Sequence, residues 1–122
     1  MLKFVPLNYN ELGLPFSEDN TLAGYIGYDL SDDNRECGKC VFRLNGYSME
    51  ILYVDSYDND PETIEGLIRS ALNYGGNRNV YMADYKADKG VEVAVALGFE
   101  DNNGVLSGDV PTLLQGSCCK GK

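Results

Sequence analysis

The chain has 122 residues, of which 43% are hydrophobic and 24% are charged. This length fits one domain with a single core, and this composition is typical of a folded globular chain. Ten lysine and arginine residues stand against nineteen aspartate and glutamate residues, which gives a net charge of −9. Because such a charge repels phosphate backbones and anionic lipid, we predict that neither nucleic acid nor a membrane is a partner.

The residues available for chemistry are restricted. Histidine does not occur in the sequence, which excludes Ser-His and Cys-His nucleophile pairs and imidazole metal ligands. Carboxylates, nine tyrosines, six lysines and four cysteines remain. The N-terminal stretch breaks at Pro6 and Asn8 before a signal-peptide core forms, and no apolar run reaches the roughly 18 residues that a membrane helix needs. We therefore expect a cytoplasmic protein.

The first half of the chain is rich in strand signals. Four runs have the residue types and alternation of β-strands: Leu2 to Leu7, Tyr25 to Leu30, Lys39 to Leu44 and Ser48 to Asp55. A long irregular connection, rich in Asn, Gly and Pro, separates the first run from the second. Asn45-Gly46 joins the last two runs and is a strong hairpin signal. The last three runs therefore predict a three-stranded antiparallel meander.

The next segment changes to the period of a helix. Its apolar residues fall at i, i+3, i+4, i+7 and i+8 and predict one buried stripe, made of Ile64, Leu67, Ile68, Ala71 and Leu72. Asp60 is a good N-cap and Pro61 suits the first helical position. Gly75-Gly76 predicts the end of the helix.

The rest of the chain predicts shorter elements: a strand from Asn79 to Tyr85, a helix from Asp88 to Leu97 and a strand from Val105 to Val110. Asp88 is the expected cap of this second helix, and Gly98 is its expected terminator. We place Val91, Ala94 and Val95 on its inner face.

The order of these elements resembles the C-terminal two-thirds of the GNAT family, the acyl-CoA-dependent N-acetyltransferases. About half of the chain carries the resemblance, in the segments Met49 to Asp55, Ile64 to Tyr74, Val80 to Tyr85 and Val91 to Phe99. In that family, a helix after the meander cradles the CoA pyrophosphate at its N-terminus, and the next strand splays away to admit pantetheine. A following helix ends in a Gly-Phe pair, as Gly98-Phe99 does here.

The resemblance implies a single α+β domain over residues 1–122, with a GNAT-like mixed, mainly antiparallel sheet of about six strands and two main helices. Residues 1–24 form a reduced N-terminal strand and loop, residues 25–116 form the core, and residues 117–122 form a tail.

The resemblance also implies a cofactor loop, with acetyl-CoA as the candidate cofactor. The corresponding cofactor-binding residues are Asp55, Ser56, Tyr57, Thr63 and Ile64. The family loop relies on glycines and an Arg or Gln, whereas residues 55–63 contain no glycine and no basic residue. Asp58, Asp60 and Glu62 also bring negative charge to the helix N-terminus. We therefore predict that acetyl-CoA binds more weakly than millimolar.

Candidate catalytic residues are Tyr81, Tyr85 and Glu50. The position of the family's general-acid tyrosine, counted back from Phe99, holds Ala94. Tyr81 or Tyr85 on the preceding strand could replace it, and Glu50 or Asp55 could act as a base, although an outward-facing, solvated strand carboxylate is the simpler explanation of either acid. Two hypotheses stay open: a non-catalytic or weakly acyl-CoA-binding scaffold or dimerisation domain, and an active acetyl-CoA-dependent N-acyltransferase for an unidentified amine.

The number of cysteines would allow a four-thiolate zinc site, but their spacing disfavours it. Cys37 and Cys40 form a CxxC motif, and Cys118-Cys119 adds two thiols. Adjacent cysteines seldom reach the same tetrahedral ion, and no secretory signal is visible. We predict reduced thiols and no metal.

Finally, the sequence predicts a homodimer. The short connection before Tyr25 leaves too few residues for the helices that cover one sheet face in the GNAT family. Both faces of the predicted strands carry apolar residues, including the aromatic side chains Tyr25, Tyr28, Phe42, Tyr53 and Tyr81. Uncovered apolar sheet surface usually marks an interface.

Overall fold

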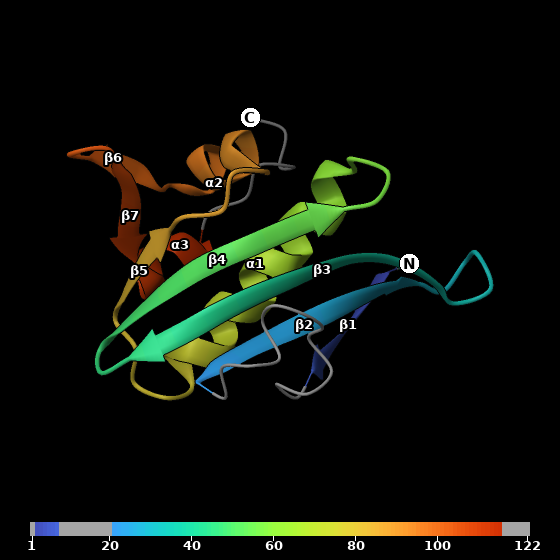
Figure 1. The fold of residues 1–122 in the computed structure, drawn as a ribbon, viewed down its shortest axis with the longest axis horizontal. Helices are drawn as coiled ribbons and strands as arrows, with labels where there is room; N and C mark the ends of the chain where they lie inside the picture. Colours follow the sequence, from blue (N-terminus) through green and yellow to red (C-terminus); the bar gives the residue numbers. More distant parts are fainter. Residues whose placement is uncertain (1, 8–20, 116–122) are drawn as a thin grey trace.

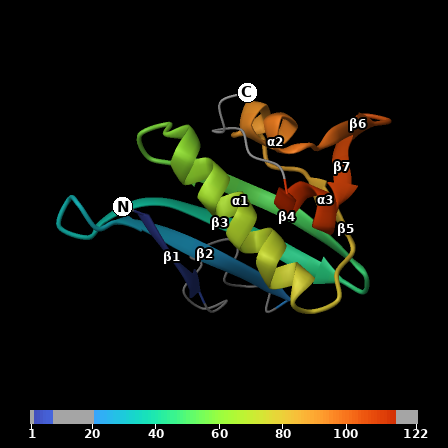
Figure 2. The same ribbon diagram turned by 180° about the vertical axis from the view of Figure 1, so that it is seen from behind.

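The computed structural model describes residues 2–7 and 21–115. These residues form a mixed sheet of seven strands in the order β1-β2-β3-β4-β5-β7-β6, crossed on one face by a long helix (Figures 1 and 2). The strands are β1 (Leu2–Leu7), β2 (Leu22–Asp29), β3 (Arg35–Asn45), β4 (Ser48–Ser56), β5 (Met82–Tyr85), β6 (Glu100–Asn102) and β7 (Val105–Asp109). The helices are α1 (Pro61–Gly76), α2 (Val91–Leu97) and α3 (Val110–Gln115).

The predicted α+β class with a mainly antiparallel sheet is confirmed. Every neighbouring pair of strands is antiparallel except β4 and β5, which run parallel. Six strands and two main helices were expected, and the described residues add the short strand β6 and the short helix α3. Most of the connection over residues 8–24 and the tail at 117–122 lie outside the described residues.

The meander forms where the sequence predicts it, with a small shift in its hairpin. The turn between β3 and β4 consists of Gly46 and Tyr47, because Asn45 already pairs with Ser48. Gly46 has a φ of +65°, as a glycine in the first central position of a two-residue hairpin loop requires. The turn therefore lies one residue later than the Asn45-Gly46 pair predicts.

Helix α1 packs on the sheet through the predicted apolar stripe. Leu67, Ile68, Ala71 and Leu72 are fully buried, and Ile64 is nearly so. The Asp60 side chain caps the helix by accepting a hydrogen bond from the Glu62 amide at 3.2 Å. The helix runs through Gly75-Gly76 to Asn77, so the glycine pair lies inside its last turn. Gly75 is needed there for packing, because a Cβ atom would lie 2.7 Å from Met49 Sδ.

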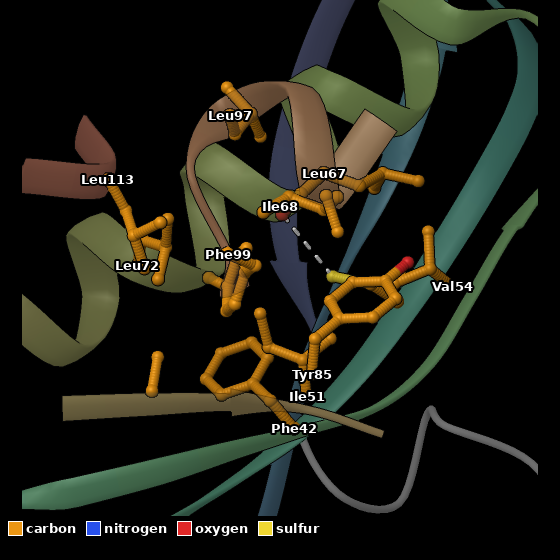
Figure 3. Packing of buried hydrophobic residues seen from close by; sticks show 14 of the residues in the cluster. Phe42, Ile51, Val54, Leu67, Ile68, Leu72, Tyr85, Leu97, Phe99 and Leu113 are labelled. Carbon is orange, nitrogen blue, oxygen red and sulfur yellow. Dashed lines mark hydrogen bonds between the residues drawn. The ribbon is translucent and has the colours of Figure 1, made fainter. Parts of the chain in front are cut away.

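The main core lies between this face of the sheet and the three helices (Figure 3). Leu67 of α1, Leu97 of α2 and Leu113 of α3 all belong to it. Inside it, the Cys40 thiol donates to the Leu67 carbonyl at 3.6 Å, and the rings of Tyr85 and Phe99 meet with their centroids 5.5 Å apart. The helices therefore cover one sheet face together.

Helix α2 starts later than the sequence predicts and turns a different side to the core. Its first residue is Val91, and its N-cap is Gly90 with a φ of +76°, so Asp88 does not cap it. Val93, Ala94 and Leu97 are the buried residues, whereas Val95 is 52% exposed. The predicted inner face was therefore wrong at Val91 and Val95. The helix is oriented by the residues just before it, where Gly90 lies close to Tyr85 and Ile64. Gly98 ends the helix as expected, with a φ of +125°.

The C-terminal region contains a hairpin and a helix where one strand was predicted. β6 and β7 are joined by Asn103-Gly104, and both residues have positive φ, at 57° and 89°. Val110 is not a strand residue, since it starts α3 and is buried in the core. β5 likewise starts at Met82 rather than Asn79, because residues before it turn to bring Val80 beneath α1.

In the described ranges, none of the helices has the length and apolar character needed to cross a membrane.

The aromatic side chains expected on uncovered sheet surface differ in their burial. Phe42 is fully buried under α1, and Tyr25 stacks on Phe42 and meets Tyr74 of α1 edge-on. On the other sheet face, Leu22 and Val41 are also buried. The expected exposed surface is thus absent at Phe42, whereas Tyr25, Tyr28 and Tyr53 are half-buried and Tyr81 is exposed.

Candidate functional site

β4 and β5 separate halfway along β4. Their parallel pairing ends at Ile51 opposite Tyr85, and the Lys86 amide makes a last hydrogen bond to the Ile51 carbonyl at 2.8 Å. The register of β4 against β3 shifts at this point, which leaves Leu52 as an extra residue in a β-bulge. β4 then continues along β3 to Ser56, whereas the chain after Lys86 leads into α2. The two strands thus form a wedge that opens toward the N-terminus of α1.

A cleft of about 530 Å³ lies at the open end of this wedge. It is bounded by the end of β4, the start of α1 and the start of α2, and it is lined by Asp55, Ser56, Asn59, Pro61, Ile64 and residues 88–93. Three of the five predicted cofactor residues, Asp55, Ser56 and Ile64, therefore line it. Tyr57 and Thr63 are not among the described lining residues.

Tyr57 and Thr63 instead have contacts within the chain. The Tyr57 hydroxyl donates to Glu36 Oε2 at 2.8 Å, and burial together with this carboxylate raises the pKa of Tyr57. Thr63 is buried, and its hydroxyl donates to Asp60 Oδ2 at 3.1 Å. Both side chains therefore stabilise the loop.

The backbone donors of this loop are largely used by the protein itself. The Asp60 amide donates to Ser56 Oγ at 2.9 Å, and the Asn59 amide donates to the Ser56 carbonyl at 3.1 Å. The Tyr57 amide donates to the Cys37 carbonyl at 3.0 Å, and the Glu62 amide donates to the Asp60 carboxylate. A phosphate-binding loop needs free amides that converge on the anion. These residues therefore do not fit a CoA pyrophosphate bound in the manner of the family.

The side chains around the loop are acidic as well. Asp58 is bound by Arg35 at 2.9 Å, and Arg35 also binds Asp32 at 2.7 Å, so the guanidinium is already neutralised. The cleft itself is lined by the carboxylates of Asp55, Asp88 and Glu92 and by the ammonium group of Lys89. The lining is thus net negative.

Tyr85 is the candidate proton donor that lies at the wedge. Its side chain is 4% exposed, and its hydroxyl donates to the Lys89 carbonyl at 2.6 Å. Burial raises the pKa of Tyr85 well above its usual range. The hydroxyl is therefore committed to a backbone acceptor and holds its proton tightly.

The other two catalytic candidates lie elsewhere. Tyr81 is 57% exposed and precedes β5, at the end of that strand away from the wedge. Glu50 accepts from Lys86 Nζ and lies 3.4 Å from Arg43 Nη1. The hydrogen bond from Lys86 lowers the pKa of Glu50, which weakens it as a base. The structure therefore brings Tyr85 and Asp55 close to one cleft and leaves Tyr81 and Glu50 outside its lining.

Lys89 and Gly90 are site residues that the sequence analysis missed. Lys89 Nζ lies 3.2 Å from Asp55 Oδ1 across the cleft. A Cβ atom at Gly90 would lie 2.7 Å from the Tyr85 hydroxyl and 2.8 Å from Ile64 Cγ2, so α2 can start here only behind a glycine. The Lys-Gly pair before an apolar segment was the available signal, and the good capping residue Asp88 outweighed it.

The cysteines are distributed between the core and the tail. Cys37 and Cys40 are buried free thiols, and burial raises the pKa of Cys40 to about 12. Cys118 and Cys119 lie outside the described residues. Across residues 2–7 and 21–115, no three His, Cys, Asp or Glu side chains are arranged to hold a metal ion.

No protein-family model matches the chain, and no curated protein matches it in sequence. Solved structures do match. A probable acetyltransferase from Staphylococcus epidermidis ATCC 12228 is 11% identical, with 89% of this chain and 99% of that chain covered and a TM-score of 0.69. The ribosomal-protein-S18-alanine N-acetyltransferase from Escherichia coli is 7% identical, with 90% and 94% covered and a TM-score of 0.65.

A third match was solved with ligands. The spermidine N-acetyltransferase from Vibrio cholerae in complex with CoA and spermine is 16% identical, with 93% of this chain and 98% of that chain covered and a TM-score of 0.62. At these identities the likeness concerns the fold. The chain therefore has the GNAT-like α+β fold over most of its length, as its element order predicts.

Proposed function

We propose that this chain is a GNAT-fold protein that binds acyl-CoA weakly and does not catalyse acyl transfer, and that it acts as a scaffold or dimerisation domain. The observation that carries this proposal is the loop before α1. Its amides at Tyr57, Asn59, Asp60 and Glu62 already have acceptors within the chain, and carboxylates surround it.

The size of the electrostatic interactions at this helix terminus favours the same conclusion. The positive end of a helix stabilises a nearby anion by about 0.3 to 1 kcal/mol. Two like unit charges about 4 Å apart near a protein surface repel each other by about 4 kcal/mol at an effective dielectric constant of about 20. Asp60 and Glu62 therefore oppose a pyrophosphate more strongly than the helix terminus attracts it, and Asp58, which Arg35 binds, adds less.

Titration calorimetry tests this proposal. We expect acetyl-CoA to bind more weakly than millimolar, which corresponds to less than about 4 kcal/mol of binding free energy. S-acetylpantetheine, which lacks the phosphates, serves as the matched ligand. Since it carries no charge to be repelled, it should bind no more weakly than acetyl-CoA. A micromolar isotherm for acetyl-CoA contradicts the proposal.

The second candidate function is an active acetyl-CoA-dependent N-acyltransferase for an unidentified amine. The wedge with its bulge at Leu52 and the cleft at its open end support it, because a cofactor could enter there. Two proteins of similar fold are named for the acetylation of spermidine and of a ribosomal-protein alanine. The test is the release of free thiol from acetyl-CoA in the presence of amines, including spermidine. Release that depends on Tyr85 or Glu50 would support this function over the first.

We also propose a homodimer. Three residues with exposed apolar side chains, Tyr47, Tyr81 and Met82, are neighbours in the fold, because the Tyr81 and Met82 amides both donate to the Tyr47 carbonyl. An exposed cluster with two tyrosines suits an interface. Light scattering at micromolar concentration should give twice the chain mass, and Tyr47→Ser with Tyr81→Ser should give the monomer. A wild-type monomer contradicts this proposal.

Two further expectations from the sequence are also proposals. A net charge of −9 disfavours nucleic acid as a partner. A cytoplasmic location remains our proposal, and fractionation of cells that express the chain tests it.

A further inference from the structure

The charge of Lys89 differs in sign from that of the other charged side chains described in the cleft lining. It is the single cationic side chain among the described residues that line the cleft, and three carboxylates accompany it. Its ammonium group lies 3.2 Å from Asp55 Oδ1, and this carboxylate raises the pKa of Lys89. Among the described lining residues, the one cationic side chain that could attract an anion into the cleft is therefore already paired.

Both partners of this contact are held in place by the fold. The Lys89 carbonyl accepts the Tyr85 hydroxyl at 2.6 Å, and Gly90 starts α2 in a left-handed conformation directly after it. Asp55 is the penultimate residue of β4, and its Oδ2 accepts the Tyr53 hydroxyl at 3.3 Å. The Asp55 side chain is 20% exposed and the Lys89 side chain is 59% exposed, so the carboxylate is the more anchored of the two.

We propose that the Asp55–Lys89 contact is autoinhibitory: Asp55 sequesters the cation that would otherwise meet a phosphate-bearing ligand in this cleft. The inference rests on the proposed function, weak acyl-CoA binding, and names a residue pair that causes the weakness. Without the charge on Asp55, the lining keeps the carboxylates of Asp88 and Glu92, and the ammonium group of Lys89 loses its hydrogen-bonded partner. The local charge then turns from net negative by two to net negative by one, and Lys89 is free to turn toward an anion.

Asp55→Asn is the variant that isolates this effect. The amide has the same shape, and its oxygen can keep the hydrogen bond from Tyr53, whereas the charge that binds Lys89 is lost. Inorganic pyrophosphate and CoA are the probes, titrated by calorimetry at low ionic strength. We expect Asp55→Asn to bind both at least about tenfold more tightly than the wild type. At an ionic strength of roughly 1 M, where the Debye length is about 3 Å, most of the gain should vanish.

Two further variants serve as controls. Asp55→Asn combined with Lys89→Met should lose the gain, because the released cation is gone. Glu100→Gln removes one negative charge from the exposed strand β6, and its affinity for both probes should stay within about twofold of the wild type. Circular dichroism checks that each variant folds. Asp55→Ser, which also carries no charge, replaces Asp55→Asn if the latter does not fold.

The outcomes separate this inference from the proposed function. If Asp55→Asn binds pyrophosphate and CoA no more tightly than Glu100→Gln, the autoinhibitory contact is overturned, while weak binding by the wild type still supports the proposed function. If the wild type already binds CoA at micromolar concentration and Asp55→Asn binds it still more tightly, the proposed function fails and the autoinhibitory contact stands. An equal gain in the double variant also overturns the contact, because Lys89 would then play no part.

Discussion

The middle of α1 and the cleft at its N-terminus are built by different kinds of interaction. In the middle, Leu67, Ile68 and Leu72 lie fully buried against the sheet. At the cleft, the start of the helix is capped by a hydrogen bond from the Glu62 amide to Asp60, Lys89 pairs with Asp55 of β4, and Gly90 lies close to the Ile64 side chain. Apolar burial contributes per unit area and tolerates small shifts, whereas each polar contact depends on its geometry. We therefore expect substitutions to have large, global effects in the first region and smaller, local effects in the second.

The largest effect is expected at Leu67. Leu67→Ala should lower the free energy of unfolding by about 2 to 5 kcal/mol, because it leaves a cavity under a fully buried helix position. Ile68→Ala should behave in the same way. Asn73→Ala on the exposed face of α1 is the control and should change little. Equal tolerance at all three positions in urea denaturation contradicts the packing described here.

Gly90→Ala should have the next largest effect. The left-handed φ of +76° and the contacts of a Cβ atom with the Tyr85 hydroxyl and Ile64 together disfavour any side chain. We expect a loss of about 1 to 3 kcal/mol. Hydrogen exchange should show that the amides of α2 lose more protection than those of β3, since the strain is local to the start of α2. Gly104 also has a left-handed backbone conformation, but a Cβ atom there would have no neighbour within 4 Å. Gly104→Ala therefore measures backbone strain without steric contacts.

The cap of α1 should contribute less. Asp60→Ala removes the acceptors for the Glu62 amide and the Thr63 hydroxyl and should lower stability by about 1 kcal/mol in urea denaturation. Asp60→Asn keeps an oxygen acceptor at this position and should recover most of the loss. If Asp60→Ala is as stable as the wild type, the loop is not ordered by this cap.

The smallest effect should depend on pH. Lys86 lowers the pKa of Glu50 in the folded protein below its ordinary value of 4.5, so the folded state favours the charged carboxylate. The stabilisation is complete above the unfolded pKa and disappears as the pH falls through the folded pKa. The stability difference between wild type and Glu50→Gln should therefore shrink between about pH 6 and about pH 3. A difference that stays constant over this range shows that the ion pair does not contribute.

Local sequence patterns were sufficient to predict the meander and helix α1. Strand alternation with the Asn45-Gly46 signal predicts the hairpin to within one residue, and the stripe from Ile64 to Leu72 predicts the buried face of α1. Asp60 acts as the cap because capping involves only neighbouring residues. The order of these elements was also enough to indicate the GNAT-like fold. Asn103-Gly104 is a hairpin signal of the same kind and marks the turn between β6 and β7.

The arrangement of residues around the cleft depends on tertiary contacts alone. Helix α2 starts at Val91 because Tyr85 and Ile64 leave room only for a glycine at position 90, and neither neighbour is adjacent in sequence. The pairing of Asp55 with Lys89 joins residues 34 positions apart, and no periodicity connects them. The sequence by itself determined which segments form strands and helices and which apolar face is buried, because those properties depend on spacing along the chain. The tertiary structure decided which charges meet across the cleft, because electrostatic pairing depends on distance in space.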